Sequence, residues 1–367
     1  MYLKKIEIFN FRNIKKLDID FNKNVNIFVG DNAQGKTSIL ESIYVLAFTK
    51  SCKAYGEDEL IKKGENFFRV KGSFKIGNLN KKMEIGYIDG VKKLKYNDKN
   101  VSKIADYISN LNVIMFSPDD LDIIKKSPIF RRNFINTELC QLYREYLIVV
   151  NEYNRLLKIR NDYIRKNCSN IDYDYLDVIT KSMASRVVVI HKYRKDFFDS
   201  INEFIGDIFY RISKIKGLSL KYKRSIDFDS FSDIYSYYKK NYSSDIDKGS
   251  TLNGPHRDDF CFYLGDDDVK LYGSQGLQRM AVLSLKLSEI NIFKTVKNSY
   301  PIVLLDDIFS EIDLNKRKNL LRFIKSNIQF IITTTDINNI SEKLLDKSTI
   351  FKISDGTIKK RSEKNGQ

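Results

Sequence analysis

One segment combines glycines, a lysine and a threonine at a spacing that suits phosphate binding. It reads Gly30-Asp31-Asn32-Ala33-Gln34-Gly35-Lys36-Thr37 and fits the pattern G-x-x-x-x-G-K-S/T. Glycines let backbone N–H groups wrap phosphates, and the N-terminus of a following helix adds positive charge. Lys36 would meet the β- and γ-phosphates, and the Thr37 hydroxyl would meet Mg²⁺. We therefore predict that residues 30–37 bind a nucleoside triphosphate.

Two neighbouring carboxylates follow an apolar run near the C-terminus. Asp306 and Asp307 come directly after Ile302-Val303-Leu304-Leu305, which has the length and composition of a buried strand. A strand that ends in two carboxylates matches a Walker B element. Asp306 would hold Mg²⁺ directly or through water, and Asp307 would orient and deprotonate the attacking water. Asp307 and Lys36 are therefore predicted catalytic residues.

A second segment suited to anions opens a helix-like run upstream of Asp306. It reads Ser274-Gln275-Gly276-Leu277-Gln278-Arg279, and such a turn at a helix N-terminus receives anions. One chain does not need two phosphate receptors for one nucleotide. We therefore expect this segment to act in trans, with Ser274 and Gln278 of one protomer contacting the γ-phosphate bound by the other. A capped surface helix is the alternative.

Two shorter segments add to this arrangement. Ser310-Glu311-Ile312-Asp313 follows the Walker B carboxylates, where a loop at the dimer seam would lie. Thr333-Thr334-Thr335-Asp336 closes the next apolar run. We expect Thr335 to be a polar residue that senses the γ-phosphate.

The elements that position these residues are those of an α/β domain split by a helical insertion. Strands are expected at 2–11, 17–21, 25–29, within 67–96, 113–116, 259–264, 269–272, 301–305 and 328–332, and helices at 36–48, 275–296 and 313–326.

Apolar residues from Ile135 to Leu156 follow 4,3 spacing on one long helix, and a second such series runs from Leu176 to Ile208. We predict a head formed by 1–116 with 250–367, and a helical arm at 117–249 built as an antiparallel hairpin. An ordinary helical bundle is the alternative.

The charge balance favours a polyanionic partner. The 367 residues carry 63 Lys or Arg and 47 Asp or Glu, a net charge of +16. Clustered cations release counterions from phosphate, so nucleic acid is the simplest partner; compositional drift from AT-rich coding is the alternative. Candidate contact faces are residues 62–103, with twelve cations and four acids, and the arm arginines Arg131, Arg132, Arg155, Arg160 and Arg165. The arm could instead hold a partner protein.

Composition disfavours several classes of protein. No run of about 18 apolar residues suggests a membrane span, and Lys4 and Lys5 come too early for a signal peptide. Four separated cysteines and two histidines give little support to a zinc site. We expect a cytoplasmic, nucleoid-associated protein without membrane contact.

These motifs together resemble the ABC-type ATPase heads of the SMC superfamily, and in particular the RecF family of bacterial repair proteins. The resemblance runs through nearly the whole chain. It also includes Ile6-Glu7-Ile8-Phe9-Asn10-Phe11-Arg12-Asn13, Phe116-Ser117-Pro118-Asp119-Asp120-Leu121 and Gly254-Pro255-His256-Arg257-Asp258-Asp259. The last segment is specific to RecF-like proteins, and the insertion is too short for a full SMC coiled coil.

The resemblance implies an α/β, ABC/SMC-like P-loop ATPase head with a mostly helical arm inserted. It implies a weak, DNA-stimulated ATPase that uses ATP and Mg²⁺ and closes as an ATP-dependent homodimer on double-stranded DNA or on gap junctions. The implied partners are RecR and RecO, which help to load RecA and so support recombinational repair, replication and the SOS response. Arg12 lies where related heads place an arginine near the nucleotide.

The sequence departs from the family pattern at three positions. Leu277 stands where the family usually has Gln, threonine replaces the switch histidine of many ABC ATPases, and Asp307 is shorter than the usual catalytic glutamate, which fits slow turnover. His256 is expected to pack rather than to contact nucleotide. Two other functions stay open: an ATP-stabilised scaffold that recruits repair proteins, and a P-loop kinase or nuclease-linked ATPase.

Overall fold

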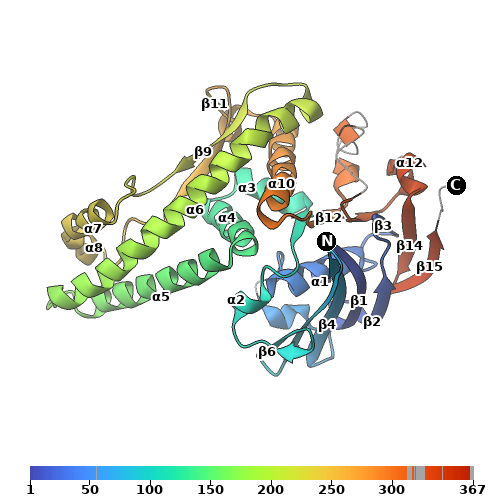
Figure 1. The fold of residues 1–367 in the computed structure, drawn as a ribbon, viewed down its shortest axis with the longest axis horizontal. Coiled ribbons are helices and arrows are strands. Elements are labelled where there is room, and N and C mark those ends of the chain that lie inside the picture. The colour runs from blue at the N-terminus through green and yellow to red at the C-terminus, as the bar shows by residue number, and fades with distance from the viewer. Residues whose placement is uncertain (55, 312–315, 318, 320–326, 341, 364–367) are drawn as a thin grey trace. The chain divides into compact units, whose positions relative to one another are not determined.

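The computed structural model describes residues 1–54, 56–311, 316–317, 319, 327–340 and 342–363 (Figure 1). They belong to two compact units. Unit 1 comprises Met1–Asp120, Tyr210–Lys214 and Leu283–Gln367, and unit 2 comprises Leu121–Phe209 and Ile215–Val282. The division into a head at 1–116 with 250–367 and an arm at 117–249 stays a prediction. No helix among the described residues is long and apolar enough to cross a membrane.

An antiparallel sheet forms the N-terminal part of unit 1, in the order β2-β1-β4-β5-β6-β7. Its strands are β1 Tyr2–Phe11, β2 Ile14–Asp20, β4 Phe67–Ile76, β5 Leu79–Ile88, β6 Val91–Tyr96 and β7 Lys99–Asn100. Alternate residues such as Ile6, Ile8 and Val70 are buried, as expected for a sheet with one face on the core. Asp89 and Gly90 both have positive φ and make the predicted tight turn.

The second sheet of unit 1 is mostly parallel, in the order β15-β14-β3-β13-β12-β8. Its strands are β3 Val25–Val29, β8 Val113–Phe116, β12 Ile302–Asp306, β13 Phe330–Thr334, β14 Ser348–Ser354 and β15 Thr357–Glu363, of which β15 alone is antiparallel to its neighbour. Every residue of β12 and β13 is buried, which explains their continuous apolar runs. The carboxyl ends of β3, β12 and β13 therefore meet at one edge.

Helix α1, Lys36–Phe48, lies between these two sheets. It contacts β1, β4 and β5 of one and β8, β12 and β13 of the other. Most of its residues are buried, including Ile39, Leu40, Ile43 and Leu46, because both of its broad faces are covered. This packing fixes the start of the helix, and hence Lys36, at the edge where the parallel strands end.

Two long helices run antiparallel, α5 Arg144–Lys166 and α6 Tyr173–Ser213 (Figure 1). Unit 2 contains all of α5 and the residues of α6 up to Phe209. Three contacts between the helices show this direction, because the residue number falls along α5 as it rises along α6. They are the ring contact of Tyr163 with Tyr175, the ion pair of Glu152 with Arg186, and the hydrogen bond from Tyr193 to Glu145. The segment 167–172 joins the two helices.

The single helix predicted from Ile135 to Leu156 is wrong. The structure has α4, Pro128–Leu142, and then α5, with Tyr143 extended between them at φ −134° and ψ 111°. The Tyr143 ring packs on Tyr193 of α6, with 4.8 Å between centroids. The apolar 4,3 spacing continues across the break. This spacing indicates which side of a helix is buried, but it does not indicate whether the helical backbone is continuous.

Unit 2 also has a small antiparallel sheet, in the order β11-β10-β9. Its strands are β9 Leu218–Lys223, β10 Asp259–Leu264 and β11 Asp267–Asp268. The strand predicted at 269–272 is wrong, because Val269–Tyr272 forms helix α9. The Asp268 carboxylate caps this helix by accepting a hydrogen bond from the N–H of Lys270 at 2.8 Å.

Among the described residues, the remaining helices are short, except for α10. They are η1 Glu57–Leu60, α2 Ile104–Tyr107, η2 Pro118–Leu121, α3 Asp122–Lys125, α7 Phe231–Lys240, α8 Tyr242–Asp247, α10 Gln275–Lys297, η3 Ile308–Glu311, η4 Ile337–Asn339 and α12 Glu342–Leu345. The residues of α10 up to Val282 belong to unit 2 and the rest to unit 1. Most of the helix expected at 313–326, together with Ile312 and Asp313 of the expected dimer loop, lies outside the described residues.

Candidate nucleotide-binding site

The P-loop follows β3 and requires glycine at two positions. Gly35 has φ 98°, a left-handed conformation, and stands at the N-cap of α1. A side chain at Gly30 would meet the carbonyl oxygen of Ile353 at 2.4 Å. The loop therefore passes close to β14 and turns directly into a helix, whose first N–H groups have no intrahelical partner.

The Lys36 side chain folds back over this loop. Its Nζ donates hydrogen bonds to the carbonyl oxygens of Gly30 and Asp31, both at 2.7 Å. Burial lowers the pKa of this ammonium, and the charges of Asp307 and Asp306 oppose that shift. Lys36 is thus a cation held by neutral acceptors, for which phosphate oxygens are a stronger alternative.

Asp306 ends β12 and links three distant segments. Its Oδ1 accepts hydrogen bonds from the hydroxyls of Thr37 at 2.8 Å and Thr333 at 2.9 Å. Its Oδ2 accepts from Lys53 Nζ at 3.1 Å. Thr333 reaches this carboxylate because the parallel register places it opposite Asp306.

Asp307 directly follows the strand in a left-handed conformation, with φ 49°. Its N–H donates to Thr333 Oγ1 at 3.0 Å. Its Oδ1 is buried and has no hydrogen-bond partner within the described residues. Backbone strain and an unsatisfied carboxylate oxygen in one residue are typical of functional sites.

These groups line one cavity of about 570 Å³ in unit 1. Of the predicted site residues, the lining includes Arg12, Asn32, Ala33, Gly35, Lys36, Thr37, Asp306 and Asp307. It does not include Gly30, Asp31, Gln34 or Thr335. Gln34 instead holds the β14–β15 turn, since its Oε1 accepts from the N–H of Asp355 at 2.6 Å. Thr333 lines the cavity where Thr335 was expected.

Arg12 follows β1 and is fixed in the cavity wall. Its Nε and Nη2 donate to the two carboxylate oxygens of Glu41 at 2.9 and 2.8 Å, and its Nη1 donates to the carbonyl oxygen of Glu59 at 2.9 Å. The bond to Glu41 raises the pKa of the guanidinium. A contact between Arg12 and nucleotide stays a prediction.

The predicted signature residues belong to unit 2. Ser274 is exposed, and its Oγ accepts from the N–H of Leu277 at 3.3 Å in the first turn of α10. Gln278 is buried, and its amide Nε2 donates to the carbonyl oxygens of Val269, Lys270 and Gly273 at 3.2, 3.3 and 3.1 Å. The Ser274 hydroxyl is therefore open to a partner, whereas the Gln278 amide secures the turn itself.

Comparison of the sequence with known proteins shows which family the chain belongs to. Residues 2–359 match the model described as RecF/RecN/SMC N terminal domain. The DNA replication and repair protein RecF of Clostridium kluyveri is 40% identical over 365 residues, covering 98% of this chain and 99% of that protein. Its counterpart in Streptococcus agalactiae serotype Ia is 39% identical, with 98% of each chain covered.

The chain belongs to the RecF family.

Solved structures agree with this membership. The structure of the recombination mediator protein RecF-ATP in the RecFOR pathway has a TM-score of 0.90 and 30% identity, over 98% of this chain and 97% of that one. The Smc head bound to the C-winged helix domain of ScpA has a TM-score of 0.57 and 19% identity, over 100% and 98%. The predicted ABC/SMC-like head fold and the role of a RecF protein in DNA replication and repair are confirmed.

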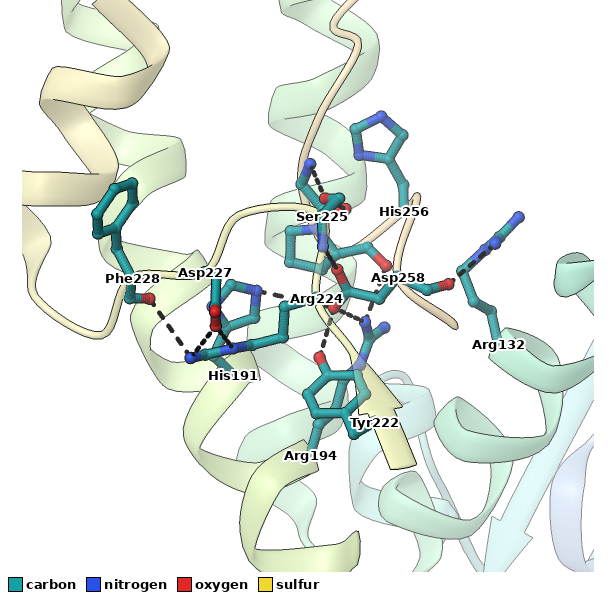
Figure 2. Close-up of polar contacts among 12 residues, drawn as sticks. Arg132, His191, Arg194, Tyr222, Arg224, Ser225, Asp227, Phe228, His256 and Asp258 are labelled. Atoms are coloured by element: carbon teal, nitrogen blue, oxygen red, sulfur yellow. Dashed lines mark hydrogen bonds and ion pairs between the residues drawn. The ribbon is translucent and has the colours of Figure 1, made fainter. Parts of the chain in front are cut away.

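The segment Gly254–Asp259, which carries part of the resemblance to RecF-like proteins and is hereafter called the family segment, contributes to a buried polar network in unit 2 (Figure 2). Asp258 is fully buried. It accepts hydrogen bonds from Arg194 Nη1 at 2.7 Å, from the N–H of Ser225 at 2.9 Å and from the Tyr222 hydroxyl. The network fastens the loop that carries the family segment to α6 and to the end of β9.

His256 packs within the same loop of this RecF-family chain, as expected. Its Nε2 donates to the carbonyl oxygen of Thr251 at 3.0 Å, which leaves Nδ1 to accept from the Tyr153 hydroxyl at 2.7 Å. Burial lowers the pKa of this imidazole to about 4. The neutral ring is therefore a structural part of the loop.

Two arm arginines suggested for DNA contact are buried, and that prediction is wrong for both. Arg131 donates to Asp259 through Nε at 2.6 Å, and Arg160 donates to Asp245 and Thr251 through Nη1 at 2.7 and 2.6 Å. Each guanidinium can be buried because a carboxylate from another element neutralises its charge. Arg155 and Arg165 are exposed, and Arg132 is half-buried.

Lys53 and Thr333 are candidate site residues that motif matching does not reveal. Nothing distinguishes Lys53 from other lysines in polar loops of this chain. Thr333 lies in the segment where Thr335 was expected to act, and only the register of β13 against β12 decides which threonine faces Asp306.

The residues present fit a magnesium ion bound together with a nucleotide. Mg²⁺ at nucleotide sites takes one or two protein oxygens and fills the rest of its shell with phosphate and water. The Thr37 hydroxyl and the Asp306 carboxylate provide such a pair, 2.8 Å apart. No group of three or more His, Cys, Asp or Glu side chains in the described ranges could hold a metal without further ligands.

Proposed function

We propose that this chain binds ATP and Mg²⁺ in the cavity of unit 1, closes on them as a homodimer, and in that state holds DNA for recombinational repair. Lys36 binds the β- and γ-phosphates, Thr37 and Asp306 hold the metal, and Asp307 orients the attacking water. Ser274 of one copy contacts the γ-phosphate bound by the other. Slow hydrolysis then reopens the dimer.

The hydrogen bond between Thr37 and Asp306 carries this proposal. It joins the P-loop to the Walker B strand across 269 positions of sequence, beside Lys36 and the unpartnered Oδ1 of Asp307. The solved relative named as RecF-ATP in the RecFOR pathway supports ATP as the nucleotide. The same name mentions the RecFOR pathway, which supports RecR and RecO as partners; RecA loading is the outcome that the family resemblance implies. The net charge of +16 supports DNA as a ligand.

Nucleotide binding and sedimentation of Lys36→Ala test the first part. We expect at least a tenfold loss of affinity for a fluorescent ATP analogue, because the phosphates lose their principal cation, and no dimer on addition of ATP. Lys93→Ala on β6, which removes an exposed lysine, is the matched control. Dimerisation of Lys36→Ala with ATP at the wild-type level would refute the proposal.

DNA binding at several salt concentrations separates the clamp from an ATP-stabilised scaffold. A clamp that grips the phosphate backbone loses affinity steeply, with log K falling by about 0.9 per phosphate contacted for each tenfold rise in salt. A scaffold binds little DNA at physiological salt, with or without ATP. ATP-dependent binding with a steep salt slope supports the clamp.

A further inference from the structure

We propose that Lys53 is the resident counter-ion of the Asp306 carboxylate and sets the magnesium concentration at which the nucleotide site loads. Lys53 follows α1 in the turn formed by residues 51–54, and its Nζ lies 3.1 Å from Asp306 Oδ2. The inference rests on the proposed function, because it takes Asp306 to serve a metal beside bound ATP.

Both oxygens of Asp306 are already engaged. Oδ1 accepts the two hydroxyl hydrogen bonds from Thr37 and Thr333, and the side chain is only 5% exposed. A metal ion, or a water bound to one, must therefore use Oδ2, which Lys53 holds. Two cations at one carboxylate oxygen repel each other strongly in a partly buried site, so Lys53 must move away when magnesium binds.

The structure lets the Lys53 ammonium leave while its backbone stays. The Lys53 side chain is 31% exposed and has four rotatable bonds. The backbone N–H groups of Lys53 and Ala54 donate to Ser51 Oγ at 2.8 and 2.9 Å, and Ser51 Oγ donates to Glu41. Glu41 is the carboxylate that also fixes Arg12, so the turn is anchored to the cavity wall.

Lys53 therefore has two opposite effects on the same carboxylate. Without metal, its charge compensates a buried Asp306, whose isolation would be costly. With magnesium, the same charge competes for Oδ2 and weakens metal binding. A purely structural lysine would have the first effect and not the second.

Magnesium titrations at saturating non-hydrolysable ATP analogue test this, with thermal midpoints measured in parallel. We expect Lys53→Met to lower the half-saturating magnesium concentration about fivefold, the scale of one partly exposed ion pair. In EDTA the variant should melt below wild type, and magnesium with nucleotide should close that gap. Lys53→Arg should raise half-saturation, because a two-pronged guanidinium is harder to displace from a carboxylate.

Lys93→Met is the matched control. Lys93 is exposed on β6 and does not line the cavity, so its loss should leave magnesium half-saturation unchanged. The proposal is overturned if Lys53→Met keeps the wild-type half-saturation, if magnesium fails to repair its stability, or, should that variant not fold, if Lys53→Arg does not raise half-saturation. Wild-type protein that binds no nucleotide would contradict the proposed function as well, which distinguishes the two failures.

Discussion

Gly254 shows how one residue of the family segment is constrained by its neighbours. It has φ 138°, and a Cβ there would lie 2.3 Å from the Tyr153 hydroxyl oxygen and 2.7 Å from that of Tyr238. We expect Gly254→Ala to lower the free energy of unfolding by about 2–4 kcal/mol in denaturant titrations, through clash and backbone strain together. Gly265→Ala, with φ 62° and nothing within 4 Å, should cost only about 1 kcal/mol. Equal losses would show that the tyrosines do not enforce glycine.

His256 should make stability depend on pH. Burial lowers its pKa from 6.5 to about 4 in the folded protein, so the unfolded chain takes up a proton first as the pH falls. The fold is therefore destabilised progressively from about pH 6.5 down to about pH 4, by at most ~1.4 kcal/mol per pH unit. In denaturant titrations from pH 7 to pH 5, the free energy of unfolding should fall less steeply with decreasing pH for His256→Gln than for wild type. Identical slopes would mean that His256 is not protected from protonation.

Motif spacing predicts the local half of the nucleotide site and misses the other half. Lys36 and Thr37 adjoin in sequence, as do Asp306 and Asp307, so a short pattern captures each pair. Lys53 meets Asp306 only because α1 ends where the turn 51–54 can return to β12. That contact follows from three-dimensional packing, and no pattern along the chain encodes it.

Elements of unit 2 are held together by the buried network of Figure 2, which joins α6, β9 and the loop of the family segment. Arg194→Met would leave Asp258 buried without its main counter-charge, and we expect a loss of about 3–5 kcal/mol in the free energy of unfolding. Arg165→Met is the control, because the side chains of Arg165 and of its partner Asp162 are 62% and 42% exposed, and it should cost about 1 kcal/mol or less. A similarly small loss of unfolding free energy in both variants would show that the buried network does not stabilise unit 2.

Element boundaries could be predicted where one periodicity dominates. The bounds of β3 and α1 agree with the sequence because an apolar strand, a glycine and a buried helix follow one another without ambiguity. The break at Tyr143 could not be predicted, because the Tyr193 ring that packs on Tyr143 belongs to a distant segment. The helix at Val269–Tyr272 has a local signal, the adjacent Asp268 cap, which the interpretation of 269–272 as a strand overlooked. The buried Arg131 and Arg160 show the same limit, since their carboxylate partners lie on other elements.

The whole molecule, in the proposed function, works as two copies that share two nucleotides. The exposed Ser274 hydroxyl and the cavity at Lys36 would then belong to one composite site, completed only by a second chain. ATP would shift the population towards the closed dimer because it binds that state better than the separate chains. The charge of +16 on each copy opposes dimerisation, so DNA should favour closure by neutralising both copies.

Sedimentation of Ser274→Arg with a non-hydrolysable ATP analogue and magnesium tests this central claim most directly. Ser169→Arg, at an exposed serine of the segment joining α5 and α6, adds the same charge elsewhere and serves as the control. The account predicts that all three proteins bind nucleotide equally, that wild type and Ser169→Arg sediment as dimers, and that Ser274→Arg stays monomeric. Dimerisation of Ser274→Arg to the wild-type extent would contradict it.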